Sequence, residues 1–129
     1  MILVDSSVWV DFFSSSPGPA GAELRRMIED GEPFALAGIV VAEVLQGLTR
    51  DSRSIEQYLQ QWEIIEPEGF ATYCRAATIY RTARANGVTL STIDTLIAAV
   101  ALERGMSLFT LNRDFVRVAR LTHSALYRF

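Results

Sequence analysis

Short apolar runs alternate with longer segments of helical periodicity along this chain. The first run, Ile2-Leu3-Val4, stops at Asp5, which is typical of a buried strand in a parallel sheet. The same pattern predicts strands at residues 2–4, 33–37, 62–65, 107–110 and 125–129, and helices at residues 6–13, 20–30, 39–48, 54–61, 68–86, 94–104 and 115–120. This alternation predicts a three-layer α/β fold, in which a mainly parallel central sheet of four to five strands is flanked by helices.

The two most apolar helical segments distribute their side chains differently. In the segment at 68–86, one stripe recurs at helical spacing and is predicted to face the core; it consists of Phe70, Tyr73, Cys74, Ala77 and Tyr80. Cys74 is therefore interpreted as an inert core thiol. The segment at 94–104 is apolar on nearly all sides, which predicts that it forms the central buried helix.

Length and composition indicate a single domain spanning residues 1–129. Half of the 129 residues are apolar, and a chain of this size can bury a core without metal or disulfide links. No apolar stretch approaches the roughly 20 residues that span a bilayer. The N-terminal segment has no basic region, and Asp5 and Asp11 interrupt its apolar residues, so no secretory signal is predicted. We therefore expect a cytoplasmic protein that does not associate with membranes.

The inventory of reactive side chains consists mainly of carboxylates. The chain has one cysteine, Cys74, and one histidine, His123, which excludes internal disulfides and chemistry that needs two imidazoles. All 12 basic residues are arginine, which excludes lysine-dependent chemistry. The net charge of −3 argues against a generally basic surface for nucleic acid. However, if four of the acids bound a metal ion, the remaining acids would be fewer than the 12 arginines. The net charge of the chain therefore does not decide whether it binds nucleic acid.

Four carboxylates occupy positions that the hydrophobic pattern leaves unexplained. Asp5 ends the first strand, Glu43 lies inside an apolar helix, and Asp94 opens the most buried helix; Asp114 follows the fourth strand. In open α/β sheets, ligands bind beyond the carboxyl ends of the strands, so these acids are expected to converge there. Ligands that are all oxygen select a hard ion, Mg²⁺ or Mn²⁺. Such an ion binds phosphate oxygens and activates water, which suits a phosphodiester substrate.

Each of these acids also has a purely structural interpretation. Asp5 precedes Ser6 and is a suitable cap for the first helix. Asp94 stands three residues after Ser91, as in a capping box, and Asn112 or Asp114 suits the start of the last helix. Glu43 has Arg50 two turns further along its helix as a candidate ion-pair partner. The prediction of a metal site therefore depends on all four acids together.

Four sequence blocks resemble, in order and approximate spacing, those of PIN-domain nucleases. They are Val4-Asp5-Ser6-Ser7-Val8-Trp9, Glu43 in its helix, Asp94-Thr95-Leu96-Ile97-Ala98-Ala99 and Thr110-Leu111-Asn112-Arg113-Asp114-Phe115. The resemblance covers the whole chain, whose length suits the single-domain toxins of VapC type. It implies a PIN fold in which Asp5 and Asp94 hold Mg²⁺ directly, with Glu43 beside them.

The fourth acid of the site differs among PIN-domain proteins. Many carry Asp at the position of Asn112, whereas others place the acid just before the Phe, as Asp114 does here. We predict that Asp114 completes the site and that Asn112 is a turn residue or helix cap. Residues 112 and 114 would be about 200° apart on a helix, so an extended or irregular backbone is expected at 112–113. Ser6 and Thr92 are candidates for hydroxyl contacts near the metal.

The resemblance implies a Mg²⁺-dependent endoribonuclease that acts as the toxin of a type II toxin–antitoxin pair. Its catalytic acids would be Asp5, Glu43, Asp94 and Asp114, with Mn²⁺ as an alternative ion. Attack by water would leave a 3′-hydroxyl and a 5′-phosphate. The implied partners are an RNA such as tRNA or rRNA, an antitoxin of VapB type, and a second copy in a homodimer. The alternatives are a carboxylate-metal phosphatase or DNA nuclease on a similar sheet, and a non-catalytic α/β interaction module.

Overall fold

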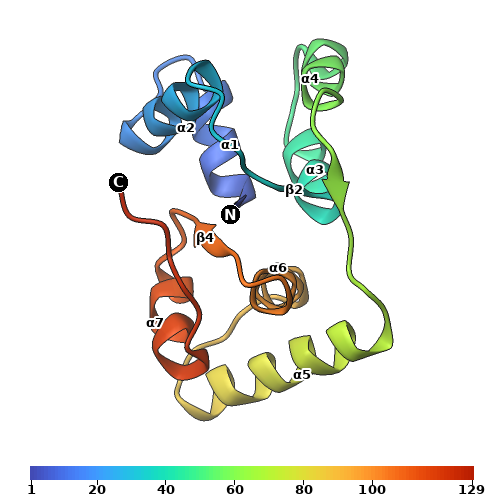
Figure 1. Ribbon diagram of the computed structural model, residues 1–129, viewed down its shortest axis with the longest axis vertical. Helices are drawn as coiled ribbons and strands as arrows, with labels where there is room; N and C mark the ends of the chain where they lie inside the picture. The colour runs from blue at the N-terminus through green and yellow to red at the C-terminus, as the bar shows by residue number, and fades with distance from the viewer.

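Two short parallel strand pairs lie at the centre of the fold, in a computed structural model that describes residues 1–129 (Figure 1). The strands are β1 (Ile2–Val4), β2 (Leu36–Ala37), β3 (Ile64–Ile65) and β4 (Ser107–Phe109). β1 pairs with β4 and β2 pairs with β3, both in parallel. A parallel bridge between Leu3 and Ala35 places the second pair beside the first, which gives the spatial order β3, β2, β1, β4. The predicted parallel arrangement is confirmed.

The sheet is less extensive than the sequence predicts. Instead of one sheet of four to five strands, the hydrogen bonds define two sheets of two strands each. The predicted strand at 125–129 is wrong, because only Leu126 forms a bridge, to Leu108. The ring centroids of Tyr127 and Phe129 each lie 5.0 Å from the ring centroid of Phe109. The apolar residues of this segment therefore cover β4 with their side chains without extending a ladder of backbone hydrogen bonds.

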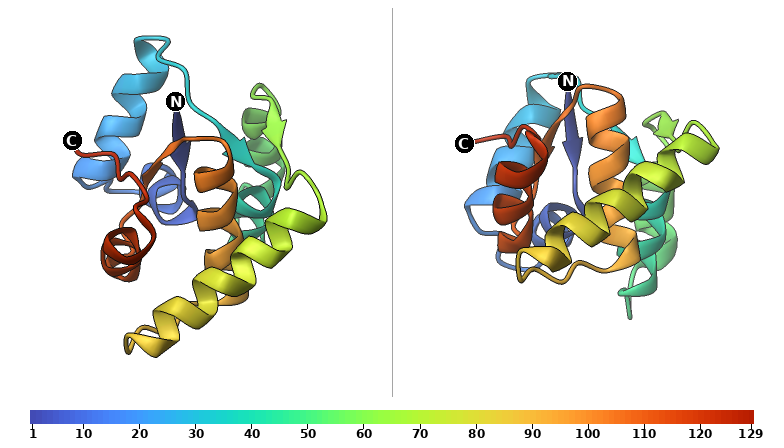
Figure 2. Two further views of the ribbon diagram at one scale, coloured as in Figure 1. Left: turned by 60° about the horizontal axis from the view of Figure 1, so that its bottom comes forward. Right: turned by 90° about the horizontal axis from the view of Figure 1, so that it is seen from below.

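Seven helices surround the strands, as predicted, with ends that shift by a few residues. They are α1 (Ser6–Phe13), α2 (Pro19–Glu29), α3 (Gly38–Gln46), α4 (Ser52–Leu59), α5 (Phe70–Ala85), α6 (Thr92–Glu103) and α7 (Arg113–Thr122). α1 packs on α2 on one side of the strands, and α5 crosses α6 on another (Figures 1 and 2). α6 begins two residues before the predicted start because the Ser91 hydroxyl caps it, accepting the Asp94 N–H at 3.1 Å. None of the helices is both long and apolar enough to cross a membrane.

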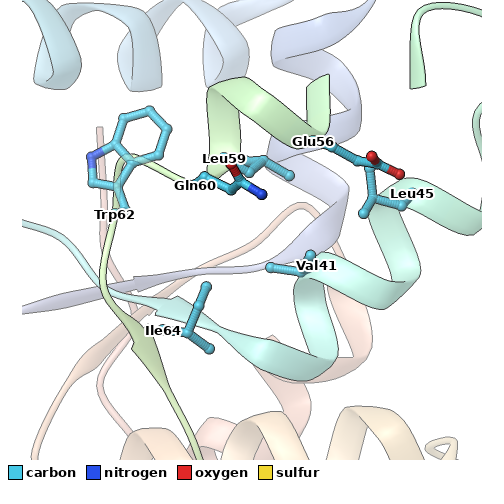
Figure 3. A pocket seen from close by; sticks show the side chains of 7 residues that line it. All are labelled: Val41, Leu45, Glu56, Leu59, Gln60, Trp62 and Ile64. Carbon is cyan, nitrogen blue, oxygen red and sulfur yellow. The ribbon is translucent and has the colours of Figure 1, made fainter. Parts of the chain in front are cut away.

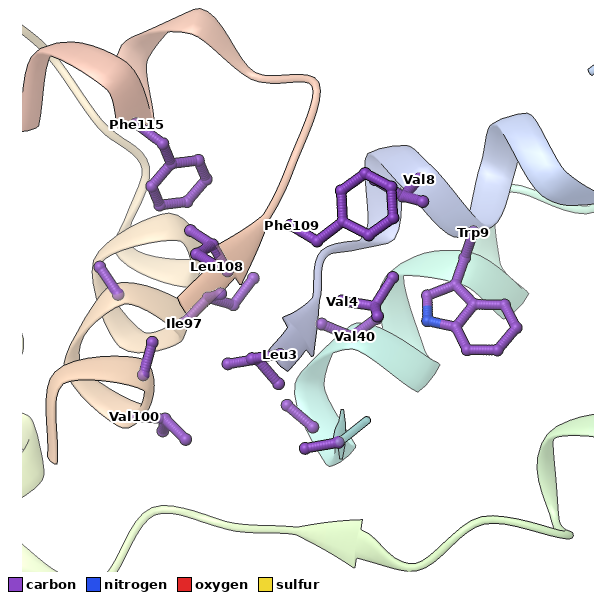
Figure 4. Packing of buried hydrophobic residues seen from close by; sticks show 14 of the residues in the cluster. Leu3, Val4, Val8, Trp9, Val40, Ile97, Val100, Leu108, Phe109 and Phe115 are labelled. Carbon is purple, nitrogen blue, oxygen red and sulfur yellow. The ribbon is translucent and has the colours of Figure 1, made fainter. Parts of the chain in front are cut away.

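The buried apolar side chains form one continuous cluster around β1, β4 and α6 (Figure 4). Its fully buried members include Leu3, Val4, Val8, Trp9, Val40, Ile97 and Phe109. In α6, the five consecutive residues from Ile97 to Ala101 are all buried. The prediction that this is the central buried helix is confirmed. Because most of α6 is enclosed, the core sets the position of its backbone relative to β1.

The buried face of α5 is not the predicted one. Phe70 and Tyr73 are 84% and 53% exposed, and Cys74 is exposed as well. The residues of α5 that are buried are Thr72, Ala76, Ile79 and Ala83. Both stripes recur every three to four residues, so periodicity alone does not distinguish them. Packing against α6 selects the stripe with small residues, and the Thr72 hydroxyl anchors it by donating to Glu103 of α6. The interpretation of Cys74 as a core thiol is wrong.

Candidate active site

Asp5 lies at the carboxyl end of β1 and is 3% exposed. Its Oδ2 accepts hydrogen bonds from the hydroxyls of Ser7 at 2.9 Å and Thr110 at 2.8 Å. Its Oδ1 is buried and has no hydrogen-bond partner. The side chain makes no capping hydrogen bond to α1, so the structural interpretation of Asp5 as a helix cap fails. A buried carboxylate oxygen without a partner is costly, and a cation is the ligand that such an oxygen suits.

Ser7 and Thr110 connect Asp5 to the turn that follows β4. The Ser7 hydroxyl accepts from the Leu111 N–H at 3.0 Å, and the Thr110 hydroxyl accepts from the Asn112 N–H at 3.0 Å. These two hydroxyls therefore fix both the Asp5 carboxylate and the turn before α7. Sequence reasoning missed both residues, although Ser7 stands three positions after the end of β1 and Thr110 one position after the end of β4.

We expect Thr110→Val to lower the free energy of unfolding by about 2 kcal/mol, because the variant loses a hydrogen bond to a buried carboxyl group. The shape of the side chain is retained, so packing changes little. Thr49→Val serves as the control, since Thr49 is exposed and makes no side-chain hydrogen bond. Urea denaturation of the three proteins measures the difference. Equal stabilities of the two variants would contradict the proposed anchoring of Asp5.

Glu43 projects from α3 towards the same edge. The Ser6 hydroxyl donates to its Oε1 at 3.1 Å. The pKa of Glu43 is raised, chiefly because burial disfavours its charged form. The hydrogen bond from Ser6 lowers this pKa, and the negative charges of Asp5 and Asp94 raise it further. Arg50 forms no ion pair with Glu43, since all three ion pairs of the structure involve Arg26. The alternative of a Glu43–Arg50 contact is therefore not borne out.

Asp94 occupies the first turn of α6, half-buried. Its pKa is also raised, mainly by burial; hydrogen bonds with Ser91 oppose the shift, and the charges of Asp5 and Asp114 reinforce it. Thr92 is exposed and contacts none of the four acids through a side-chain hydrogen bond. The Ser91 cap that the sequence predicts is present. Asp94 also interacts electrostatically with Asp5 and Asp114, so capping is not its only interaction.

Asp114 belongs to the first turn of α7, and Asn112 caps this helix. The Asn112 side chain accepts the Asp114 N–H at 3.0 Å, with an extended backbone at φ −78° and ψ 113°. The expected extended conformation at Asn112 and its capping role are therefore confirmed. The expectation for Arg113 is wrong, because the cap starts the helix at that residue. Asp114 still lies near enough to Asp94 to influence its pKa.

The structure thus brings the four predicted acids to one edge of the strands. Charge interactions link Asp5, Glu43 and Asp94, and Asp94 in turn to Asp114. No group of three or more acidic, histidine or cysteine side chains is already arranged to hold a metal ion. The donor set is oxygen only, which fits Mg²⁺ or Mn²⁺, and the unpartnered Asp5 Oδ1 is the oxygen best prepared to bind it.

A PIN domain family profile matches residues 2–121. The chain belongs to the PIN domain family. It is 32% identical over 127 residues to a VapC ribonuclease of Mycobacterium bovis and, equally, to the ribonuclease VapC11 of Mycobacterium tuberculosis, covering 95% of each chain in both comparisons.

Solved structures of similar fold cover nearly the whole chain. FitAcB from Neisseria gonorrhoeae matches with a TM-score of 0.76 and 21% identity, over 99% of this chain and 97% of that one. VapBC2 from Rickettsia felis, bound to a DNA fragment from its promoter, matches with a TM-score of 0.77 and 20% identity, over 100% and 99%. The PIN fold expected from the sequence is therefore confirmed.

A separate apolar cavity lies between α3, α4 and β3 (Figure 3). It has a volume of about 290 Å³ and is lined by Val41, Leu45, Glu56, Leu59, Gln60, Trp62 and Ile64. Val41 and Leu45 are four residues apart and share one face of α3, whereas Glu43 is rotated by about 200° from Val41. None of the four clustered acids lines this cavity, so the candidate chemistry lies elsewhere.

Proposed function

We propose that this PIN-domain protein is a Mg²⁺-dependent endoribonuclease and the toxin of a type II toxin–antitoxin pair. The observation that carries the proposal is the 32% identity to VapC ribonucleases over 95% of both chains. The cluster of Asp5, Glu43, Asp94 and Asp114 at the carboxyl edge of the strands also supports it, because oxygen ligands suit the Mg²⁺ ion that hydrolysis of a phosphodiester would use. We also infer that residues 1–129 form a single PIN domain, in keeping with one continuous core.

In this proposal, Asp5 and Asp94 would hold Mg²⁺, and Glu43 and Asp114 would complete the site through water. Mg²⁺, when bound, supplies positive charge to a phosphate oxygen and an activated water for attack. Ser7 and Thr110 hold the Oδ2 of Asp5 by hydrogen bonds and leave its Oδ1 available. Glu43 has a raised pKa through its burial, which suits a group that exchanges a proton with water. Water as the nucleophile gives a 3′-hydroxyl and a 5′-phosphate.

The proposed partners follow from the relatives. Solved neighbours include VapBC toxin–antitoxin complexes from Rickettsia felis and Salmonella typhimurium, so we propose that an antitoxin of VapB type binds this chain. Homodimer formation and an RNA substrate such as tRNA or rRNA belong to the same proposal. An enzyme that cuts such RNA acts where translation occurs, and we therefore place it in the cytoplasm.

Purified protein is expected to cut total RNA in the presence of Mg²⁺ or Mn²⁺, and excess EDTA should stop the reaction because it removes the ion and the acidic cluster contains no imidazole or thiol that could act in its place. Mapping of the cut ends should find 3′-hydroxyls and 5′-phosphates. Single-stranded DNA and a phosphate monoester serve as comparison substrates in the same buffer. Undiminished cleavage in EDTA would refute the metal mechanism, and faster turnover of either comparison substrate would favour a DNA nuclease or a phosphatase.

A further inference from the structure

The solvent-facing side of α7 carries arginines that no acid neutralises. The exposed residues of this helix are Arg113, Val116, Arg117 and Arg120. The three arginines are four and three positions apart, so they lie within about 60° of one another around the helix axis. We call them the arginine stripe. All ion pairs of the structure involve Arg26, so the guanidinium groups of the stripe are free to bind an anion from outside.

The charge of this part of the chain is opposite in sign to that of the rest. Residues 105–129 contain four arginines and a single acid, Asp114, whereas residues 1–104 contain eight arginines and fourteen acids. The fourth of these arginines, Arg128, is also exposed. The protein is acidic as a whole and yet has one basic surface, and such a surface attracts polyanions.

The stripe begins at the acidic cluster. Arg113 directly precedes Asp114 in the chain, and the charge of Asp114 acts on Asp94. Arg117 stands three positions after Asp114, so their Cβ atoms lie about 5–6 Å apart on the helix. The two side chains nevertheless form no ion pair. Asp114 therefore remains available to the proposed Mg²⁺ site, and Arg117 to a phosphate.

A second connection links the stripe to Asp5. Val116 lines a cavity of about 350 Å³ together with Thr110 and Arg128, and the Thr110 hydroxyl donates to Asp5 Oδ2 at 2.8 Å. Val116 is rotated by about 60° from Arg113, so this cavity borders the stripe. The stripe therefore has an acid of the cluster on one side and a residue that binds another of these acids on the other side.

The length of the stripe suits several nucleotides. Arg120 comes seven positions after Arg113, which places it about 10 Å further along the helix axis. A stacked strand rises about 3.4 Å per phosphate, so the stripe spans about three phosphates. The planar guanidinium group of arginine matches phosphate in geometry.

We propose that the arginine stripe binds the phosphates of the RNA strand that flanks the bond to be cut and leads this strand to the acidic cluster. The inference rests on the proposed ribonuclease function and adds the surface that holds the substrate. The acids of the cluster repel a polyanion, and the stripe supplies positive charge beside them. Contacts to phosphates carry no sequence information, so the stripe contributes affinity for RNA without selecting the site of cleavage.

The test compares two double variants that each remove two positive charges. Arg117→Gln with Arg120→Gln changes the stripe, and Arg113 is kept because it borders the acidic cluster. The control combines Arg53→Gln and Arg75→Gln, at exposed positions in α4 and in the first half of α5. α7 lies beside the other end of α5, and α4 is remote from it (Figures 1 and 2).

Fluorescence anisotropy measures binding of a labelled oligouridylate in excess EDTA at several salt concentrations. Cleavage assays with Mg²⁺ measure kcat and KM for a minimal RNA around a mapped cut site and for the same RNA extended on both sides. Denaturant melts measure stability, because Arg120 in the last turn of α7 also interacts favourably with the helix dipole. That structural role predicts a change in stability and none in RNA binding.

The stripe variant is expected to reduce the slope of log affinity against log salt by about 1.4, which is 0.7 for each phosphate contact in a single strand. Between 0.05 and 0.2 M salt, the wild type should therefore lose about sevenfold more affinity than the stripe variant. The variant should raise KM for the extended RNA with kcat retained, and should leave the minimal RNA unaffected. The control should match the wild type in both assays.

A stripe variant with the slope and KM of the control would overturn the inference while the ribonuclease function stands. Equal effects on the minimal and the extended RNA would also overturn it, because the stripe would then not bind the flanking strand. A wild type that cuts no RNA would refute the ribonuclease function, whereas a reduced slope in the same protein would still support phosphate binding by the stripe.

Discussion

Asp94→Asn is expected to reduce RNA cleavage by more than about 100-fold while the protein stays folded. Removal of groups that only contact a metal ligand costs about 10- to 100-fold, so neutralising a ligand itself is expected to cost more. Asn caps helices about as well as Asp, and the variant keeps the backbone N–H of residue 94 that the Ser91 hydroxyl accepts. A purely structural role for Asp94 therefore predicts no loss, and full activity of the variant would contradict the metal site.

The same variant is expected to be more stable than the wild type at neutral pH without metal. Burial and the charges of Asp5 and Asp114 raise the pKa of Asp94 above its ordinary 3.8, which means that its ionised form destabilises the fold. This penalty is present above the raised pKa and disappears as the pH falls towards the value in the unfolded chain. Thermal melts in EDTA between neutral and acidic pH measure it, and Asp51→Asn, at an exposed position outside the cluster, is the control.

The second large effect is expected at Asp114. Asp114→Asn should lower the rate or the apparent Mg²⁺ affinity by about 10- to 100-fold, as for groups that act on a metal through an outer contact. Asn112→Ala should instead cost about 1 kcal/mol of stability through loss of the cap on α7, because its side chain accepts the Asp114 N–H. Mg²⁺ titrations of cleavage and denaturant melts of both variants separate the two roles.

The reverse pattern would exchange the roles of these residues. If Asn112→Ala stops cleavage at every Mg²⁺ concentration and Asp114→Asn does not, Asn112 belongs to the site and only three acids remain in it. A variant of Asn112 that loses activity in proportion to its folded fraction, by contrast, confirms the capping role. Measuring activity and the folded fraction in the same sample distinguishes these outcomes.

The order and type of the helices, the parallel pairing of the strands and the gathering of four acids at one edge of the strands were predictable from the sequence, whereas the catalytic roles of these acids stay a prediction. The reason is that each rests on local information. An apolar run that stops at Asp5 predicts the end of a strand, and a segment that is apolar on nearly all sides predicts the buried helix α6. An acid inside an apolar helix, such as Glu43, can be recognised from the sequence without knowing where the helix packs. The absence of lysine and the single His123 restricted the chemistry in the same way, because composition limits which ligands exist.

Contacts between distant segments were decided only by the tertiary structure. Thr110 reaches Asp5 across 105 positions and Ser6 reaches Glu43 across 37, and no pattern along the chain encodes such pairs. The exposed stripe of α5 was mistaken for its core face because two stripes share one periodicity, and only packing against α6 selects between them. The sequence thus determined which carboxylates are available. The packing of β1 against β4 determined which hydroxyls bind Asp5 and which of its oxygens is left without a partner, because hydrogen-bond partners are set by proximity in space.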